Sequence, residues 1–71
     1  MHARDPYTTG FHEKTDEHEI EQVFEHSPKG QVVAEWWSVW SFLTQDEPDH
    51  CSSLASARRW LADQKAIAEK R

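Results

Sequence analysis

Residues 32–43, VVAEWWSVWSFL, form the long apolar stretch of this 71-residue chain and hold three of its four tryptophans. The stretch is rich in valine and aromatic residues, which suit a pleated strand. It follows Ser27-Pro28-Lys29-Gly30, in which the proline suits the second position of a type I turn and the glycine suits a positive φ. Because apolar residues flank this turn on both sides, the sequence predicts a β-hairpin with strands at about 17–26 and 31–43.

Residues 52–70 are predicted to form one helix that packs on the hairpin. Ser52 or Ser53 can cap its N-terminus, and no glycine or proline interrupts it. Its apolar residues recur at spacings of three and four along the chain: Leu54, Ala57, Trp60, Leu61, Ile67 and Ala68. The expected fold is therefore α+β. The alternative is a three-helix bundle, with helices near 16–26, 28–45 and 52–70, because several polar residues of the tryptophan-rich stretch also share one helical face.

The length limits the protein to one small domain, which we expect over residues 15–71. Residues 1–14 have little periodicity and are predicted to form a flexible N-terminal arm. Cys51 is the only cysteine, so no intrachain disulfide can form, and a lone thiol suits the cytoplasm. The N-terminus has no apolar leader segment, and the apolar stretch is shorter than the roughly 20 residues of a membrane span. We expect a cytoplasmic protein with no membrane partner.

The hairpin turn and the start of the helix resemble those of small phage and prophage accessory proteins of ββα outline. The resembling segments are SPKGQVV at residues 27–33 and SLASARRWL at residues 53–61. Such proteins often bind and inhibit a host enzyme. The resemblance therefore implies a protein that inhibits a host protein by binding it.

The hairpin carries aromatic side chains on both faces, and one helix can cover only one of them. With a four-residue loop, His26 faces Gln31 and Ile20 faces Trp37, and that face of the hairpin packs on the helix. The opposite face stays uncovered, and a monomer rarely shows such an apolar patch unless it binds something. This face is the predicted partner-binding site, and it consists of Glu17, Glu21, Glu25, Trp36, Trp40 and Phe42.

The sequence leaves three alternatives for what covers that face. One is a host protein, the second is another copy of the chain in a homodimer, and the third is the N-terminal arm. In the third case Tyr7 and Phe11 would fold back against the tryptophans.

The net charge is −5, and most acidic residues lie in the first half of the chain. An acidic run on a strand can simply keep the face solvated, or it can mimic a nucleic-acid backbone. Alternate strand residues lie about 6.8 Å apart, which gives half the charge density of a strand with a phosphate every ~3.4 Å. Mimicry predicts a host protein with a basic groove that handles nucleic acid. Direct nucleic-acid binding is not expected because it needs a basic patch, for which Arg58 and Arg59 are the alternative candidates.

No motif supplies a catalytic site, a metal site or a cofactor site. The five histidines and Cys51 lack the C-x-x-C or H-x₃-H spacing of a closed zinc site. His50 and Cys51 are neighbours in the sequence, and adjacent side chains rarely point at each other. We therefore expect a protein that is not an enzyme and that binds no cofactor.

Overall fold

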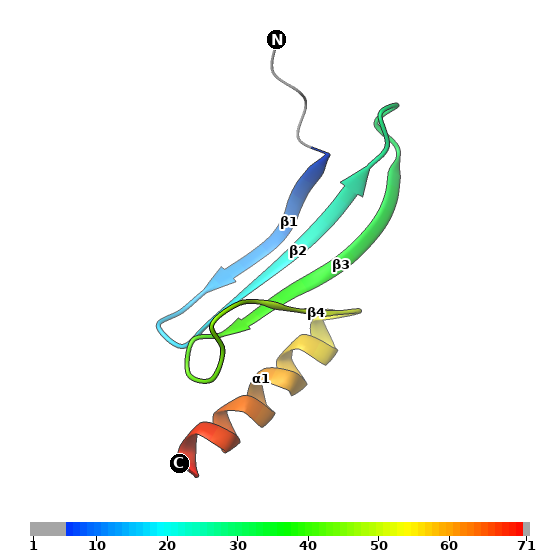
Figure 1. Ribbon diagram of the computed structural model, residues 1–71. Coiled ribbons are helices and arrows are strands. Elements are labelled where there is room, and N and C mark those ends of the chain that lie inside the picture. Colours follow the sequence, from blue (N-terminus) through cyan, green and yellow to red (C-terminus); the bar gives the residue numbers. More distant parts are fainter. Residues whose placement is uncertain (1–5, 71) are drawn as a thin grey trace.

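Residues 6–70 are described by a computed structural model, in which a four-stranded antiparallel sheet packs on one helix (Figure 1). The predicted α+β fold is confirmed, and the three-helix bundle is wrong. The sheet has four strands where the sequence analysis expected two. In sheet order the strands are β1 (Tyr7–Lys14), β2 (His18–His26), β3 (Val32–Ser41) and β4 (Asp49–Cys51), and the helix is α1 (Leu54–Glu69).

The turn between β2 and β3 has the predicted chemistry. Gly30 has a φ of +88°, a conformation that glycine adopts without steric cost. Its N–H donates to the carbonyl of Ser27 at 2.8 Å, and the N–H of Ser27 donates to the carbonyl of Gln31 at 2.7 Å. The turn therefore joins β2 and β3 as the hairpin that the sequence predicts.

The register of this hairpin differs by two residues from the predicted one. Ile20 lies opposite Val39, whereas the four-residue loop predicted Trp37 there. The loop has five residues instead of the expected four, so His26 faces Val32 and the register shifts by one. An irregularity between Glu25 and His26 shifts the register by one more residue. Because the shift is even, every side chain of the ladder keeps its predicted face.

Alternation along β3 places its side chains on two faces of the sheet. Trp37 and Val39 pack with residues of α1 on the side that we call the helix face. Trp36, Ser38 and Trp40 lie on the other side, which we call the open face.

The flexible arm predicted over residues 1–14 is wrong for residues 7–14, which form β1; residues 1–5 lie outside the described residues. β1 pairs with an edge of β2 that would otherwise present unpaired backbone groups. A bulge between Thr9 and His12 breaks the alternation that marks a strand in a sequence. Gly10 makes this bulge possible, because a Cβ there would lie 2.5 Å from Oε1 of Gln22 and 2.8 Å from the Phe24 ring.

The buried core is small and lies where α1 packs on the sheet. Ile20, Val39 and Ala57 are fully buried, and partly buried side chains surround them: Trp37, Cys51, Leu54, Trp60 and Leu61. Cys51 belongs to β4, a three-residue strand between the predicted hairpin and the predicted helix. The hairpin end of the sheet projects beyond α1 (Figure 1). Much of the sheet is therefore left uncovered on both faces.

Candidate protein-binding face

The predicted aromatic residues lie together on the side of the sheet away from the helix. Trp36 and Trp40 are on the open face, two residues either side of Ser38. Phe42 follows the end of β3, and its ring lies edge-on to Trp40 at 5.0 Å between centroids. All three aromatic side chains are partly exposed.

The neighbours of Trp36 come from strands that the sequence did not predict. The ring of Tyr7 in β1 lies edge-on at 5.8 Å, and the ring of His50 in β4 lies at 5.7 Å with a tilt of 39°. Phe11, however, packs against Trp37 on the helix face, at 5.7 Å. Residues 7–14 thus lie in the plane of the sheet as β1, and of the alternative in which the N-terminal arm covers the open face they keep only the contact between Tyr7 and Trp36.

Strand β2 gives the open face its charge. Glu19, Glu21 and Glu25 lie opposite Trp40, Ser38 and Ala34 respectively. Oε2 of Glu19 is 2.7 Å from Nε2 of His12. The carboxylates of Glu21 and Glu25 have no hydrogen-bond or ion-pair partner within residues 6–70. Together with Lys14 of β1, which lies opposite Glu19, they are charged groups of this face that another molecule can still pair.

Glu17 does not lie with the other predicted carboxylates. It belongs to the turn before β2, where strand alternation no longer applies, and it lines a hollow between the sheet and α1. Nζ of Lys65 is 3.9 Å from Oε2 of Glu17. The predicted site therefore loses Glu17. Glu19 joins the site instead, because it lies on the open face opposite Trp40, two residues from Glu21 along β2.

A polar cluster holds β1 and α1 against each other on the helix face. Oε2 of Glu13 lies 2.7 Å from Nε2 of His18, and Nη2 of Arg58 donates to Oε1 of Glu13 at 3.2 Å. Hydrogen bonds from His18 and Arg58 lower the pKa of Glu13, so its carboxylate stays ionised. Arg58 is thus already paired within the fold.

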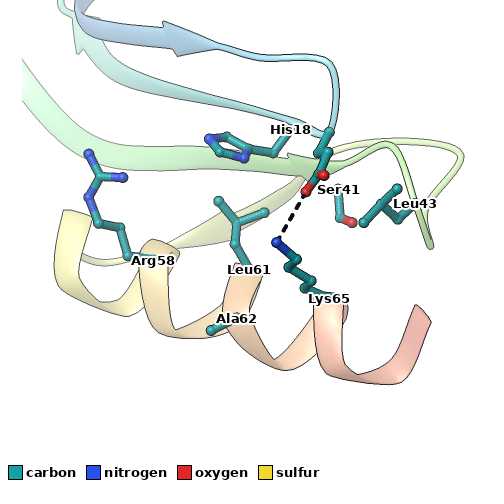
Figure 2. A pocket seen from close by; sticks show the side chains of 8 residues that line it. His18, Ser41, Leu43, Arg58, Leu61, Ala62 and Lys65 are labelled. Carbon is teal, nitrogen blue, oxygen red and sulfur yellow. Dashed lines mark ion pairs between the residues drawn. The ribbon is translucent and has the colours of Figure 1, made fainter. Parts of the chain in front are cut away.

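A shallow hollow of about 230 Å³ lies between α1 and the adjoining ends of β2 and β3 (Figure 2). Its cations face carboxylates of the same chain: Arg58 pairs with Glu13, and Lys65 with Glu17. The hollow therefore offers little uncompensated charge to a ligand. Its lining is formed by Glu17, His18, Ser41, Leu43, Arg58, Leu61, Ala62 and Lys65.

The structure separates His50 from Cys51. His50 stacks beside Trp36 on the open face, whereas Cys51 packs against the core on the helix face. Burial, followed by the nearby charge of Asp49, raises the pKa of the Cys51 thiol, which disfavours a reactive thiolate. Within residues 6–70 there is also no group of three or more His, Cys, Asp or Glu side chains placed to hold a metal ion.

No helix among the described residues is both long enough and apolar enough to cross a membrane. Comparison of the chain with protein-family models, with curated proteins and with solved structures found no match.

Proposed function

We propose that this protein is a non-catalytic binding module whose open face docks on a basic surface of another protein. One observation carries the proposal: Glu21 and Glu25 have no partner within the described part of the chain, and they lie opposite Ser38 and Ala34, the open-face residues on either side of Trp36. Tryptophans are among the residues that contribute most to protein interfaces. Covering a large apolar side chain is worth roughly 1.5–3 kcal/mol.

The partner is expected to be basic because of the position of the carboxylates. β2 is an inner strand of the sheet, so any molecule that covers the open face also covers Glu21 and Glu25. Removing an unpaired carboxylate from water is costly, but an arginine or lysine from the partner would restore its pairing. The same cation can also lie against the tryptophan rings, which attract positive charge.

A second copy of the chain suits the open face poorly. A symmetric contact places identical patches against each other. Such a contact would bring two copies of Glu19, Glu21 and Glu25 together, whereas Lys14 is the one lysine or arginine among the described strand residues of this face, so like charges would outnumber opposite charges across the interface. Charge therefore favours a foreign partner on this face.

We further propose that docking inhibits the partner, as the resemblance to phage accessory proteins implies, in the host cytoplasm. A groove that binds phosphates and stacks bases offers both cations and aromatic contacts, which the open face can occupy. Glu19 and Glu21 lie two residues apart on one face, about 6.8 Å. A nucleic-acid-handling enzyme is thus the partner class that we propose.

The proposal is tested by affinity capture from host lysate at low and high salt, with quantitative comparison of wild type and the double variant Glu21→Gln/Glu25→Gln. We expect a basic protein that wild type recovers at low salt and that the double variant loses. Ile67→Lys alters an exposed helix residue away from the open face and is expected to recover the same protein. Recovery that is equal for wild type and the double variant at both salt levels would contradict the proposal.

A further inference from the structure

Strand β3 has an outer backbone edge that β4 covers over part of its length. β2 pairs with β3 from Val32 to Ser41, whereas β4 pairs with residues 37–39. Towards the hairpin turn β3 therefore continues beyond β4, and no strand of the described chain lies along its outer side there (Figure 1). We call the outer edge of residues 32–36 the free edge of β3.

Backbone hydrogen bonds at the far end of β3 show which residues direct their peptide groups outwards. The N–H of Phe42 donates to the carbonyl of Glu17, beside β2, at 2.9 Å. The N–H of Ser41 donates to Oε1 of Gln45, and its carbonyl accepts the N–H of Gln45, each at 3.0 Å and in the loop that leads to β4. Outward and inward residues alternate along a strand, and the register with β2 is unbroken from Ser41 through Glu35. Glu35 therefore directs its N–H and its carbonyl to the free edge.

These two backbone groups of Glu35 have no hydrogen-bond partner within residues 6–70. Unpaired groups along a strand are a template for another strand, and sheets commonly block such an edge with a bulge, a proline or a lysine. The edge strand β1 carries a bulge between Thr9 and His12. Residues 32–36 contain no proline or lysine, and the irregularity of the β2–β3 ladder lies nearer the turn than Ala34. Glu35 is thus available for pairing in regular strand geometry.

The side chains beside the free edge determine which strand fits. Glu35 is exposed on the helix face, where Nε2 of Gln22 donates to its Oε1 at 2.9 Å, and its carboxylate has no cation partner within residues 6–70. Trp36 is partly exposed on the open face. Residues that lie opposite each other on neighbouring strands are in contact. An added strand therefore matches the edge when a lysine or arginine lies opposite Glu35 and an apolar residue lies opposite Trp36.

Glu35 also opposes a second copy of the chain at this edge. Symmetric antiparallel pairing of two β3 edges around this residue would place two Glu35 carboxylates close together on the same side of the joined sheet. Like charges on neighbouring strands destabilise the pairing, whereas opposite charges stabilise it. The same carboxylate therefore disfavours self-pairing and favours a basic strand.

We infer that the free edge of β3 binds an extended basic segment of another protein as an added antiparallel strand. The segment runs in line with β4, which also pairs antiparallel with β3, and it exchanges backbone hydrogen bonds with Glu35. Its side chains alternate, with cations on the helix face and apolar groups on the open face. The inference does not rest on the proposed function, because it uses a backbone edge and Glu35 rather than the open-face carboxylates of Glu21 and Glu25.

Titration of the full chain with the end-blocked peptide Thr-Lys-Val-Lys-Thr, followed by backbone amide magnetic resonance, tests the inference. The amide signal of Glu35 is expected to shift and its hydrogen exchange to slow, because the peptide supplies an acceptor for this N–H. In an antiparallel pair, peptide residues on the same face as Glu35 also direct their N–H groups towards it. Backbone N-methylation of both lysines should therefore abolish binding, and N-methylation of the valine and threonines should not. Equal binding of the two methylated peptides would overturn the inference.

Two protein variants test the charge at the edge. Glu35→Gln keeps an oxygen that can accept the hydrogen bond from Gln22, and it should weaken peptide binding about threefold, as expected for loss of an exposed ion pair. Glu21→Gln removes the same charge from the open face of β2 and is the matched control, which should bind nearly as well as wild type. Equal weakening by both variants would mean attraction by overall charge and would overturn the inference.

Two further outcomes would place a different occupant at the edge or the peptide elsewhere. Slow exchange of the Glu35 amide without peptide, together with twice the chain mass of 8.3 kDa in sedimentation, would mean that a second copy fills the edge. Peptide-induced shifts at Trp36 and Trp40 with none at the Glu35 amide would place the peptide on the open face. Either result overturns the inference, and the second leaves the proposed function standing.

Discussion

At the scale of single residues, the β1 bulge depends on the absence of a side chain at position 10. The nearest groups to a Cβ at Gly10 are the Gln22 amide and the Phe24 ring. Moving the Gln22 amide would break its hydrogen bonds with the Phe11 N–H and with Glu35, and the Phe24 ring would have to shift as well. Gly10 thus explains how an irregular segment still joins the sheet.

Gly10→Ala is expected to destabilise the protein by about 1–2 kcal/mol, because a Cβ 2.8 Å from the Phe24 ring forces a shift that outweighs the lower entropy of the unfolded chain. Urea unfolding followed by tryptophan fluorescence measures the change. Thr9→Ala, one residue earlier in the same strand, is the control and should change stability much less. Equal stability of Gly10→Ala and wild type would show that the bulge tolerates a side chain.

Glu13 predicts a specific loss of stability in acid. Its pKa is lowered in the folded state by hydrogen bonds from His18 and Arg58. A carboxyl with a lowered folded-state pKa stabilises the protein above its unfolded pKa, about 4.3 for glutamate, and this contribution is lost as the pH falls towards the folded value. Glu13→Gln should therefore be less stable than wild type near neutral pH, and the two should converge as the pH falls from about 4.3 through the lowered folded-state pKa.

Thermal unfolding as a function of pH measures this convergence. Glu21→Gln is the control, because it removes a carboxylate that has no partner within residues 6–70, and it is expected to be as stable as wild type near neutral pH. A difference between wild type and Glu13→Gln that is constant from neutral pH to pH 3 would contradict the assignment of the Glu13 cluster.

At the scale of elements, α1 begins at a cap that the sequence identified. Oγ of Ser53 accepts the N–H of Ser56 at 3.1 Å, and the backbone at Ser53 is extended. Such a cap satisfies one of the free N–H groups of the first helical turn. Since α1 supplies the buried Ala57 and partly buried side chains of the core, its stability is coupled to that of the whole domain.

Ser53→Ala is expected to lower the free energy of unfolding by about 1 kcal/mol through loss of this cap. Chemical denaturation followed by circular dichroism gives the value. Ser52→Ala removes a hydroxyl from the exposed preceding residue and should be nearly neutral. If the two variants were equally stable, the cap would contribute nothing to the domain.

The elements also show what the sequence can predict. The β2–β3 hairpin and α1 were predictable because Gly30 marks a turn and the alanine-rich helix has an unbroken apolar stripe. β1 was missed because its bulge at Gly10 removes the alternation of a strand. β4 was missed because three residues with no apolar side chain except Cys51 carry no periodicity. Both strands owe their structure to pairing with a neighbour, which a local pattern does not reveal.

The same limit applies to the candidate site. Alternation placed Trp36, Trp40, Glu21 and Glu25 on the open face correctly, and an even error in register did not disturb that. Alternation failed at Glu17, because a turn residue can point to either side of the sheet. The Glu17 carboxylate lies on the side of α1, where it pairs with Lys65 of that helix. The sequence also could not show that α1 leaves the hairpin end uncovered, since that depends on where the helix packs.

At the scale of the whole molecule, the sheet separates two kinds of surface. The open face combines tryptophans with carboxylates that lack a partner within residues 6–70, which suits a basic foreign protein. On the other side, α1 covers the core around Ile20 and Val39 and leaves Val32 and Val33 exposed near the hairpin turn.

The measurement that tests the binding face most directly is a nitrogen–proton correlation spectrum of the indole N–H groups during titration with an arginine-rich peptide. The chain has four tryptophans, and a tryptophan-to-phenylalanine variant of each assigns its signal. The signals of Trp36 and Trp40 are expected to shift, with an effect that weakens as salt is added, while those of Trp37 and Trp60 stay in place. No shift in any indole signal, or shifts confined to Trp37 and Trp60, would contradict the account.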